Sequence, residues 1–588
     1  MNGLEAFGGD EDAALRYAIA LSLQDTGTAS SKTPIEIESD SEGDDDDLDK
    51  GPKYPPVTKE PEHRNEKHEP QAARLPQISS VSQPSPSPTP SGFASLGLDR
   101  KKMEEERLAR LGKRKVPESE PESQGRTQRQ KLDPEFTAHP VSKSNVRLPY
   151  AKGTVKKTWA KGFARKDDIK IEEVLQKDEL ELAVISSFQW DERWMLSKID
   201  YYKTKILCIA FASNEAQQEE MKANVPTGAA IKFCFPPMMS TGNMHSKLQL
   251  LKYRSYLRVV VPSGNFVPYD WGETGVIENM VFLIDLPRLD NPNPTTPSKL
   301  GLFGEELCYF LRAQGLEESL VSSLKNYDFS EADRYRFVHT IGGSHVGDKW
   351  RRTGYCGLGR AVKSLGLDTT NNIEIDFLAS SLGSLNFDLL SAIYYAAQGD
   401  DGMKEYGIRS AKSGKKKLPA QTKLELKDKF RIYFPSRDTV IQSRGGKDAA
   451  GTICTQSKWW DSASFPRELI HDCKSVRSGL LIHSKLMLVH HSNSNESKPA
   501  FVYVGSANIS ESAWGHLVKE RGTGNPKLNC RNWECGVIVP ISPRNLAEDG
   551  SRPSSVSNFH DAIPVPMNIP SEAYGDTKSK RPWFFLED

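Results

Sequence analysis

Two histidine–lysine pairs, one in each half of the sequence, hold the residues whose types and spacing could do chemistry. His245 and Lys247 open one apolar run, and His483 and Lys485 open another. Residues two apart on a β-strand point to the same face, so each pair would present an imidazole beside an ammonium group. An imidazole can act as a nucleophile or as a general acid and base, and an ammonium group can offset the charge of an anion. A single pair is usually an ordinary surface or core feature, but a second copy favours a shared site.

Each pair is followed by a second matching signal. The first leads into an apolar strand predicted over 257–262 and a small-residue turn that presents Asn265. The second leads into a strand predicted over 501–505 and a similar turn that presents Asn508. The repeated set of histidine, lysine, strand, turn and asparagine indicates that the two halves of the chain contribute equivalent groups to one site.

The duplicated set resembles the phospholipase D superfamily, whose phosphodiesterases bring two His-x-Lys motifs together. In phospholipases D an aspartate normally follows the lysine after four residues. This chain holds Tyr253 at that position in the first copy, and His490 or His491 around it in the second. The motif without aspartate is similar to that of the tyrosyl-DNA phosphodiesterase family.

The resemblance implies a role for each residue of the motifs. His245 would be the nucleophile and form a covalent phosphohistidine, while His483 would act first as general acid and then as general base. The groups that offset the charge of the phosphodiester and stabilise its transition state would be Lys247, Lys485, Asn265 and Asn508. No cluster of Asp, His or Cys with metal-ligand spacing surrounds the motifs. We therefore expect hydrolysis without a metal ion or any other cofactor.

An acidic residue also stands before an apolar strand in each half. Glu534 precedes the run 535–540, and Glu278 precedes the run 279–284. In the family, such positions hold a glutamate in the second half and a glutamine in the first, each of which orients a catalytic histidine. Glu534 would thus fix the tautomer of His245. Glu278, or another residue nearby, would serve the other histidine.

Further matches to the family lie outside the repeat and would contact the DNA. The segment 380–385 resembles a Ser-Ser-x-Gly-Ser-Leu loop whose hydroxyls and amides meet the DNA backbone, and 506–515 is close to a long signature after the second motif. The residues expected to bind substrate, besides the two lysines, are Ser381, Gly383, Ser384 and Ser506. The resemblance covers residues 146–588, including Arg581-Pro582-Trp583 near the C-terminus.

Strands and helices alternate through both halves, which predicts an α/β fold. The histidines lie 238 residues apart, at 245 and 483, far more than the period of a short tandem repeat. We therefore predict two phospholipase-D-like α/β/α domains, 146–340 and 341–588, related by a pseudo-twofold axis and sharing one active site.

The first 145 residues are predicted to form a disordered regulatory tail, because they are poor in apolar residues and rich in Pro, Ser, Gln and charge. Residues 1–50 hold 14 acidic and three basic residues, a net charge of −11. Since the whole chain is neutral, residues 51–588 carry +11. A basic body suits a polyanionic partner.

Three short segments of the tail resemble recognition motifs. The segment 10–25 is similar to a ubiquitin-interacting motif, although it could be an incidental amphipathic helix. The segment 34–47 is similar to a SUMO-interacting motif or is a solvated acidic run, and 100–115 resembles a bipartite nuclear localisation signal or is a charged helix. The residues that would face ubiquitin are Leu15, Ala18, Ile19 and Ser22.

Other features limit the class of protein to which the chain can belong. No apolar run approaches the roughly 18 residues of a membrane span, and no signal peptide is recognised, so we expect a soluble intracellular protein without membrane contact. The eight cysteines form no Cys-x-x-Cys pair, which favours reduced thiols over a zinc site or disulfides.

Together these features predict a monomeric nuclear DNA-repair enzyme. The resemblance implies hydrolysis of the bond between a tyrosine of topoisomerase I, or its peptide, and a DNA 3′-phosphate, leaving a 3′-phosphate end. Other blocked 3′ ends, on single- or double-stranded DNA, would be secondary substrates. The alternatives are another nuclease or phospholipase of the superfamily, or a catalytically inert scaffold that reads ubiquitin and SUMO.

Overall fold

The structure is a computed structural model that describes most of the chain after the predicted tail. The described residues are 148–239, 242–289, 300–410, 426–491, 500–541, 559, 562–574 and 580–585. The predicted tail over 1–145 lies outside them, so its ubiquitin-interacting, SUMO-interacting and nuclear-localisation segments stay predictions. Helix α5 (Glu215–Ala223), whose first turn is capped by the side chain of Asn214, does not belong to the compact unit that holds the other described residues.

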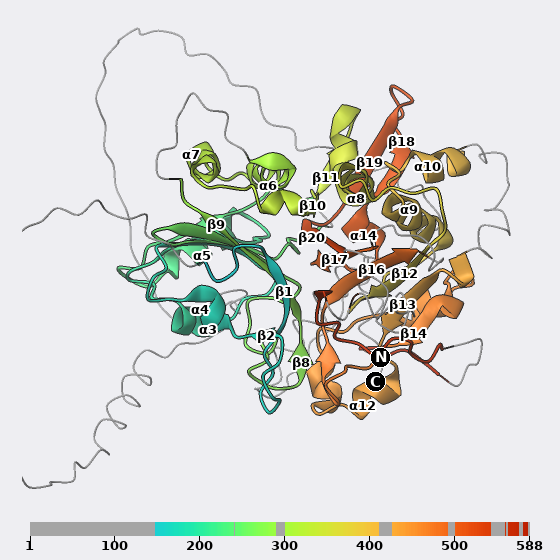
Figure 1. Cartoon of the computed structure of the whole chain (residues 1–588), viewed down its shortest axis with the longest axis horizontal. Coiled ribbons are helices and arrows are strands. Elements are labelled where there is room, and N and C mark those ends of the chain that lie inside the picture. The colour runs from blue at the N-terminus through green and yellow to red at the C-terminus, as the bar shows by residue number, and fades with distance from the viewer. Residues whose placement is uncertain are drawn as a thin grey trace, which may run out of the picture. The chain divides into compact units, whose positions relative to one another are not determined.

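The first half is built on an eight-stranded mixed sheet with strand order β2-β1-β9-β7-β6-β3-β4-β5 (Figure 1). Its strands are β1 (Thr154–Thr158), β2 (Asp168–Ile169), β3 (Leu182–Ser186), β4 (Lys205–Ile209), β5 (Ile231–Cys234), β6 (Leu248–Lys252), β7 (Tyr256–Pro262) and β9 (Met280–Pro287). The other helices up to residue 334 are α3 (Ile171–Leu175), α4 (Glu192–Lys198), α6 (Gly301–Ala313), α7 (Glu318–Ser322), η4 (Ser323–Asn326) and η5 (Ala332–Arg334).

The second half is built on a seven-stranded mixed sheet with order β10-β20-β17-β16-β12-β13-β14. Its strands are β10 (Arg336–Thr340), β12 (Ile373–Leu378), β13 (Phe430–Phe434), β14 (Ile470–Asp472), β16 (Lys485–His491), β17 (Ala500–Gly505) and β20 (Glu534–Ile541). Its helices are η6 (Gly347–Arg352), α8 (Gly354–Ser364), α9 (Phe387–Ala397), α10 (Met403–Ser410), α12 (Arg437–Ile441), η7 (Gly446–Ala450), α13 (Ser457–Trp460), η8 (Arg467–Leu469) and α14 (Glu511–Trp514).

Two smaller sheets complete the set of described strands. One joins β11 (Gly343–His345), β19 (Pro526–Cys530) and β18 (His516–Lys519). The other pairs β8 (Ile277–Glu278) of the first half with β15 (Leu481–Ile482) of the second, in parallel. This short pair joins the two halves by main-chain hydrogen bonds.

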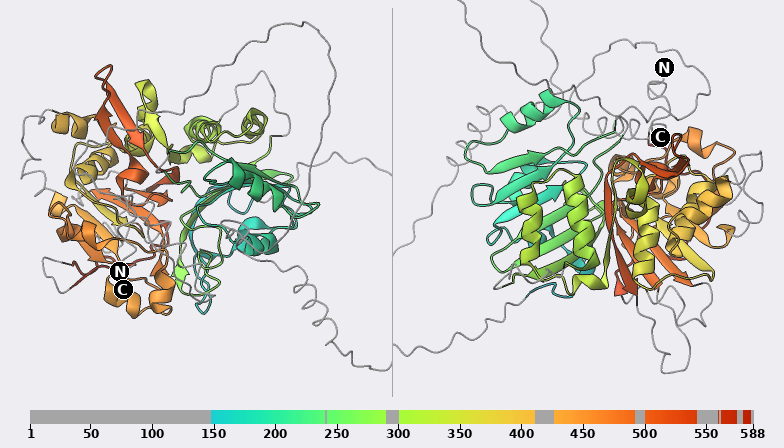
Figure 2. Two further views of the ribbon diagram at one scale, coloured as in Figure 1. Left: turned by 180° about the vertical axis from the view of Figure 1, so that it is seen from behind. Right: turned by 90° about the horizontal axis from the view of Figure 1, so that it is seen from above.

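The alternation of side chains along the strands explains how the two large sheets pack. In β7, Val259 and Val261 join an apolar cluster that also holds Val502 and Val504 of β17. The residue between them, Val260, joins a separate cluster with helices α3 and α4. Strand β7 therefore turns one face toward the second sheet and the opposite face toward α3 and α4. Figure 2 shows the two halves side by side in both further views.

The α/β fold predicted from the sequence is confirmed, and one boundary needs correction. All strands of the first large sheet end by Pro287, and all strands of the second begin at or after Arg336. Strand β10 was placed in the first domain by the predicted boundary between residues 340 and 341. It pairs with β20 and belongs to the second sheet.

Candidate active site

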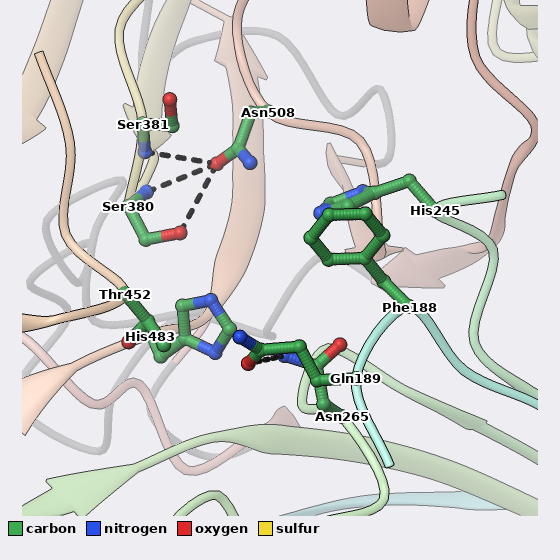
Figure 3. Close-up of a pocket in the computed structure, with 9 residues that line it drawn as sticks. All are labelled: Phe188, Gln189, His245, Asn265, Ser380, Ser381, Thr452, His483 and Asn508. Carbon is green, nitrogen blue, oxygen red and sulfur yellow. Dashed lines mark hydrogen bonds between the residues drawn. The ribbon is translucent and has the colours of Figure 1, made fainter. Parts of the chain in front are cut away.

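The histidines of the two His-x-Lys motifs meet in one pocket between the halves, whereas Lys247 and Lys485 are not among its lining residues. His245 and Lys247 directly precede β6, while His483 and Lys485 lie where the chain passes from β15 into β16. The pocket is lined by residues of both halves, as Figure 3 shows: Phe188, Gln189, His245, Asn265, Ser380, Ser381, Thr452, His483 and Asn508. The structure thus brings both predicted histidines and both predicted asparagines together.

His245 is backed by the carboxylate of Glu534, as the sequence predicts. Its Nδ1 lies 2.9 Å from Glu534 Oε2, and both side chains are buried. With the Nδ1 proton on the carboxylate side, the lone pair of Nε2 is available for attack. Burial lowers the pKa of His245 to about 4, against the opposing effect of Glu534. The ring is therefore neutral near pH 7, as a nucleophile must be.

Glu534 is itself held by two neighbours. The Ser506 hydroxyl donates to Oε2, and the Asn532 amide donates to Oε1 at 3.2 Å. Ser506 Oγ also accepts from the backbone N–H of Cys535 at 3.0 Å. Ser506 was expected to bind substrate, but it is fully buried and supports the carboxylate behind His245 instead.

His483 is backed by Asp270, which sequence reasoning missed. The Nδ1 atom lies 2.8 Å from Asp270 Oδ1, and the carboxylate is fully buried. Asp270 also accepts from the side-chain amide of Asn279 at 2.8 Å and from the backbone N–H of Asn265 at 2.6 Å. Burial raises the pKa of Asp270, but His483, Lys485 and the N–H of Asn265 outweigh this effect, so the pKa of Asp270 is lowered. Burial lowers the pKa of His483 to about 4 even though Asp270 opposes it.

The prediction that the Glu278 carboxylate orients a histidine by a hydrogen bond to its ring is wrong. The Glu278 carboxylate accepts from the Ser475 hydroxyl and lies 3.4 Å from Arg477 Nη1. Asp270 is the nearby residue that serves His483.

Each histidine takes its carboxylate from the other half of the chain. His245 and Glu534 are separated by 289 residues, and His483 and Asp270 by 213. Neither half alone contains a complete histidine–carboxylate pair of the site.

The two lysines are fully buried and turn back on their own motifs. Lys247 Nζ donates to the carbonyl of His245 at 2.9 Å, and Lys485 Nζ donates to the carbonyl of His483 at 2.5 Å. Burial lowers the pKa of Lys247 to about 8, although Glu534 and Asp270 oppose the shift. Burial and the nearby Lys247 hold the pKa of Lys485 well below its usual range. Two amines close enough to repel each other form a place for an anion.

The two asparagines are held in different ways (Figure 3). Asn508 Oδ1 accepts from the backbone N–H groups of Ser380 and Ser381, each at 3.1 Å, and from the Ser380 hydroxyl at 3.2 Å. This fixes the amide so that its NH₂ group is the part left for a ligand. Asn265 donates through Nδ2 to Gln189 Oε1 at 3.2 Å. Tyr269 donates to the same oxygen at 2.6 Å.

The predicted DNA-contacting loop borders the pocket at its first residues. Ser381 lines the pocket and pairs with Cys454 by a β-bridge, while Leu382 pairs with Ile509. Ser384 is exposed, whereas Gly383 is buried, and neither lines the pocket. Their contact with DNA stays a prediction.

Three lining residues carried no signal in the sequence. Phe188 packs on His245 with ring centroids 5.2 Å apart at an interplanar angle of 56°. Gln189 follows it, and Thr452 comes from the segment after η7. All three lie in loops, where side-chain periodicity gives no indication of what a residue faces.

Two kinds of feature are missing from the described part of the chain. Within it, no group of three or more His, Cys, Asp or Glu side chains is placed to hold a metal ion. No helix there is long and apolar enough to cross a membrane.

Comparison with known proteins points to one family. A family model described as tyrosyl-DNA phosphodiesterase matches residues 154–575. The chain is 24% identical over 397 residues to "Tyrosyl-DNA phosphodiesterase 1" of Arabidopsis thaliana, a match that spans 65% of this chain and 60% of that protein.

The fold also has solved relatives. A crystal structure of the yeast tyrosyl-DNA phosphodiesterase matches with a TM-score of 0.52 and 17% identity, covering 74% of this chain and all of the yeast chain. A point mutant of the yeast enzyme matches with a TM-score of 0.52 and 16% identity, covering 74% and 99%. At these identities the likeness concerns the fold.

Proposed function

Because the chain belongs to the tyrosyl-DNA phosphodiesterase family, we propose that it hydrolyses the bond between a tyrosine and the 3′-phosphate of DNA. The observation that supports this best is the pocket in which two buried histidine–carboxylate pairs face two asparagines. Such a constellation provides a nucleophile, an acid and base, and donors for the phosphate oxygens.

In the first step, His245 Nε2 attacks phosphorus and forms the P–N bond of a phosphohistidine. The bond between phosphorus and the tyrosine oxygen breaks, and the oxygen takes a proton from His483 in its imidazolium form, which is the minor form near pH 7 because the pKa of this ring is about 4. A phenol has a pKa of about 10, so this leaving group needs little help from an acid. The neutral state of His245, which its pKa of about 4 ensures, matters more.

In the second step, water attacks the phosphohistidine and gives its proton to His483. Water is a poor nucleophile without a base, so this step depends on a neutral, correctly oriented His483. Its pKa of about 4 keeps the ring neutral, and Asp270 stabilises the imidazolium that forms when the proton arrives. The phosphohistidine bond breaks, and a 3′-phosphate end and free His245 result.

The phosphate oxygens would be held by the buried amines and amides. Lys247 and Lys485 supply positive charge, and the NH₂ group of Asn508 supplies a fixed donor. Preorganised donors in a site from which water is excluded stabilise developing charge strongly. These groups would supply the charge that a divalent ion provides in other phosphodiesterases, so we expect activity without metal.

The identity of the substrate and the cellular location are inferred from the sequence and from the family. The tyrosine would belong to topoisomerase I or its peptide, with other blocked 3′ ends as secondary substrates. The tail would bring the enzyme to ubiquitin- or SUMO-modified proteins in the nucleus.

The test uses a 5′-labelled single-stranded oligonucleotide that ends in a 3′-phosphotyrosine. The purified full chain, in excess EDTA, should convert it to a 3′-phosphate end, and His245→Ala should abolish the conversion. His345→Ala is the matched control, because His345 is a buried histidine that bonds the carbonyl of Ile341 and does not line the pocket. Conversion that needs added magnesium would contradict the role given to the lysines. A lack of conversion in all conditions would favour the inert scaffold.

A further inference from the structure

A buried ionic cluster crosses the boundary between the two halves beside the active site. Arg477, which lies between β14 and β15 of the second half, reaches into the first half. Its Nη2 lies 3.0 Å from Asp168 Oδ2, and its Nη1 donates to the carbonyl of Thr158 at 2.8 Å. The same Nη1 lies 3.4 Å from Glu278 Oε2. Only 8% of the Arg477 side chain is exposed, and the two carboxylates are buried.

Ser475 completes this cluster. Its hydroxyl donates to Glu278 Oε1 and accepts from the backbone N–H of Arg477 at 2.9 Å. Two residues of the second half therefore hold one carboxylate of the first. We call the set Asp168, Glu278, Ser475 and Arg477 the latch.

The latch is coupled to the main chain of His483. Strand β8, which carries Glu278, pairs with β15, so that Ile482 lies opposite Glu278. The backbone N–H of His483 donates to the carbonyl of Glu278 at 3.0 Å. Glu278, whose carboxylate contacts Ser475 and Arg477, thus also accepts a hydrogen bond from the main chain of His483.

The latch is also coupled to the ring of His483 through the next residue. Asn279 donates from Nδ2 to Asp270 Oδ1, the oxygen that lies against His483 Nδ1. The Asn279 carbonyl accepts from the N–H of Thr158 at 2.8 Å, and the Thr158 carbonyl accepts from Arg477. Both the backbone and the imidazole of His483 therefore depend on the position of residues 278–279.

From this connectivity we propose that Glu278 and Arg477 are positioning residues, which fix His483 relative to the phosphate held by the other half. The proposal rests on the proposed function. Loss of the latch would let residues 278–279 shift, and a misplacement of about 1 Å in a catalytic group can cost about a hundredfold in rate. The step most affected should be the one that needs His483 as a base, which is hydrolysis of the phosphohistidine.

A buried ion pair elsewhere provides a matched control. Arg258 of β7 and Asp285 of β9 form a fully buried pair at 2.7 Å inside the first sheet. The residues to which Arg258 donates are Glu173, Val174, Tyr256 and Asp285, and none of them lines the pocket. Its removal should weaken the fold without altering the balance of the two chemical steps.

The experiment compares Arg477→Met and Glu278→Gln with Arg258→Met in the full chain. Tyrosine release and decay of the covalent protein–DNA adduct are measured separately in single-turnover reactions, and Tm reports folding. For both latch variants we expect adduct decay to slow by about ten- to a hundredfold, release to slow much less, and adduct to accumulate. For Arg258→Met we expect a lower Tm and an unchanged ratio of the two rates.

Several outcomes would overturn the proposal. One is a folded latch variant whose decay-to-release ratio equals that of the wild type, and another is an equal change of that ratio in Arg258→Met. If Arg477→Met does not fold, Glu278→Gln provides the test alone. This variant should fold, because its amide oxygen can still accept from Ser475. A wild type that releases no tyrosine would overturn the proposed function itself, whereas an active wild type with unaffected latch variants would overturn only the latch.

Discussion

Asp270→Asn is the most informative single change at this site. The substitution keeps the size of the side chain but replaces one oxygen by an NH₂ group. Asp270 Oδ1 meets His483 Nδ1 and the Asn279 amide, and Oδ2 meets the N–H of Asn265. All three neighbours can serve as donors. An asparagine therefore either opposes a buried N–H group with its own NH₂ or forces His483 into the other tautomer.

The magnitude follows from the hydrogen bond that is lost. A bond to a charged group contributes about 1.5–3 kcal/mol. At about 1.36 kcal/mol per tenfold change in rate, this corresponds to a loss of about 10- to 150-fold. The loss should fall on the step in which His483 becomes an imidazolium as it takes the proton of water. Tyrosine release should be slowed less, because a phenolate leaves with little protonation.

The assay separates these two steps. Enzyme in excess over 3′-phosphotyrosyl DNA is quenched at successive times, and denaturing gels resolve substrate, covalent adduct and 3′-phosphate product. The Asp270→Asn protein should accumulate adduct, as should His483→Ala. Asp285→Asn removes another fully buried carboxylate, one that bonds Arg258, and it controls for the loss of a buried charge.

Three results would refute this reasoning. Equal slowing of release and decay would mean that Asp270 does not act through the base. Wild-type rates in Asp270→Asn would mean that His483 needs no carboxylate. Accumulation of adduct in Asp285→Asn would assign the effect to general destabilisation of the first half.

Two further predictions concern pH and charge. His245 and His483 have pKa values of about 4 in the folded chain and about 6.5 when unfolded, so the unfolded chain binds more protons between these values. The free energy of unfolding should thus fall as pH drops from about 6.5 to 4, by up to about 3 kcal/mol per histidine. Urea titrations at several pH values measure this dependence, and His483→Asn should make the free energy of unfolding depend less steeply on pH. Asn508→Asp should put an anion where the phosphate binds and raise KM for the oligonucleotide at least about tenfold. The Tm of this variant should change little. An unchanged KM would contradict the phosphate site.

Much of the fold and the motifs could be predicted because their signals are local. A strand buried on both faces appears as a continuous apolar run, such as 259–261 in β7, whose two faces pack on different clusters. The spacing of histidine and lysine is local too. His245 and Lys247 directly precede β6, and the amine of Lys247 reaches the carbonyl of His245 two residues earlier.

The carboxylate behind His483 could not be found in this way. Symmetry between the halves selects Glu278, which stands shortly before β9 as Glu534 stands at the start of β20. Neighbouring residues of an extended chain face opposite ways, and here Asn279 faces Asp270 while Glu278 faces Ser475 and the boundary between the halves. Asp270 itself lies in the loop between β7 and β8, where no periodicity shows its direction.

The exchange of carboxylates between the halves explains why the site depends on the whole fold. Each histidine is placed by a local motif, but its carboxylate arrives from 289 or 213 residues away across the apolar layer between the sheets. A half that folded alone would hold one histidine and one carboxylate of the site, each without its partner. Reactivity therefore appears only when the halves are joined, and any contact that sets their alignment acts on both histidines. The β8–β15 pair and the latch beside it lie at this boundary, so a change there can alter catalysis without touching the substrate.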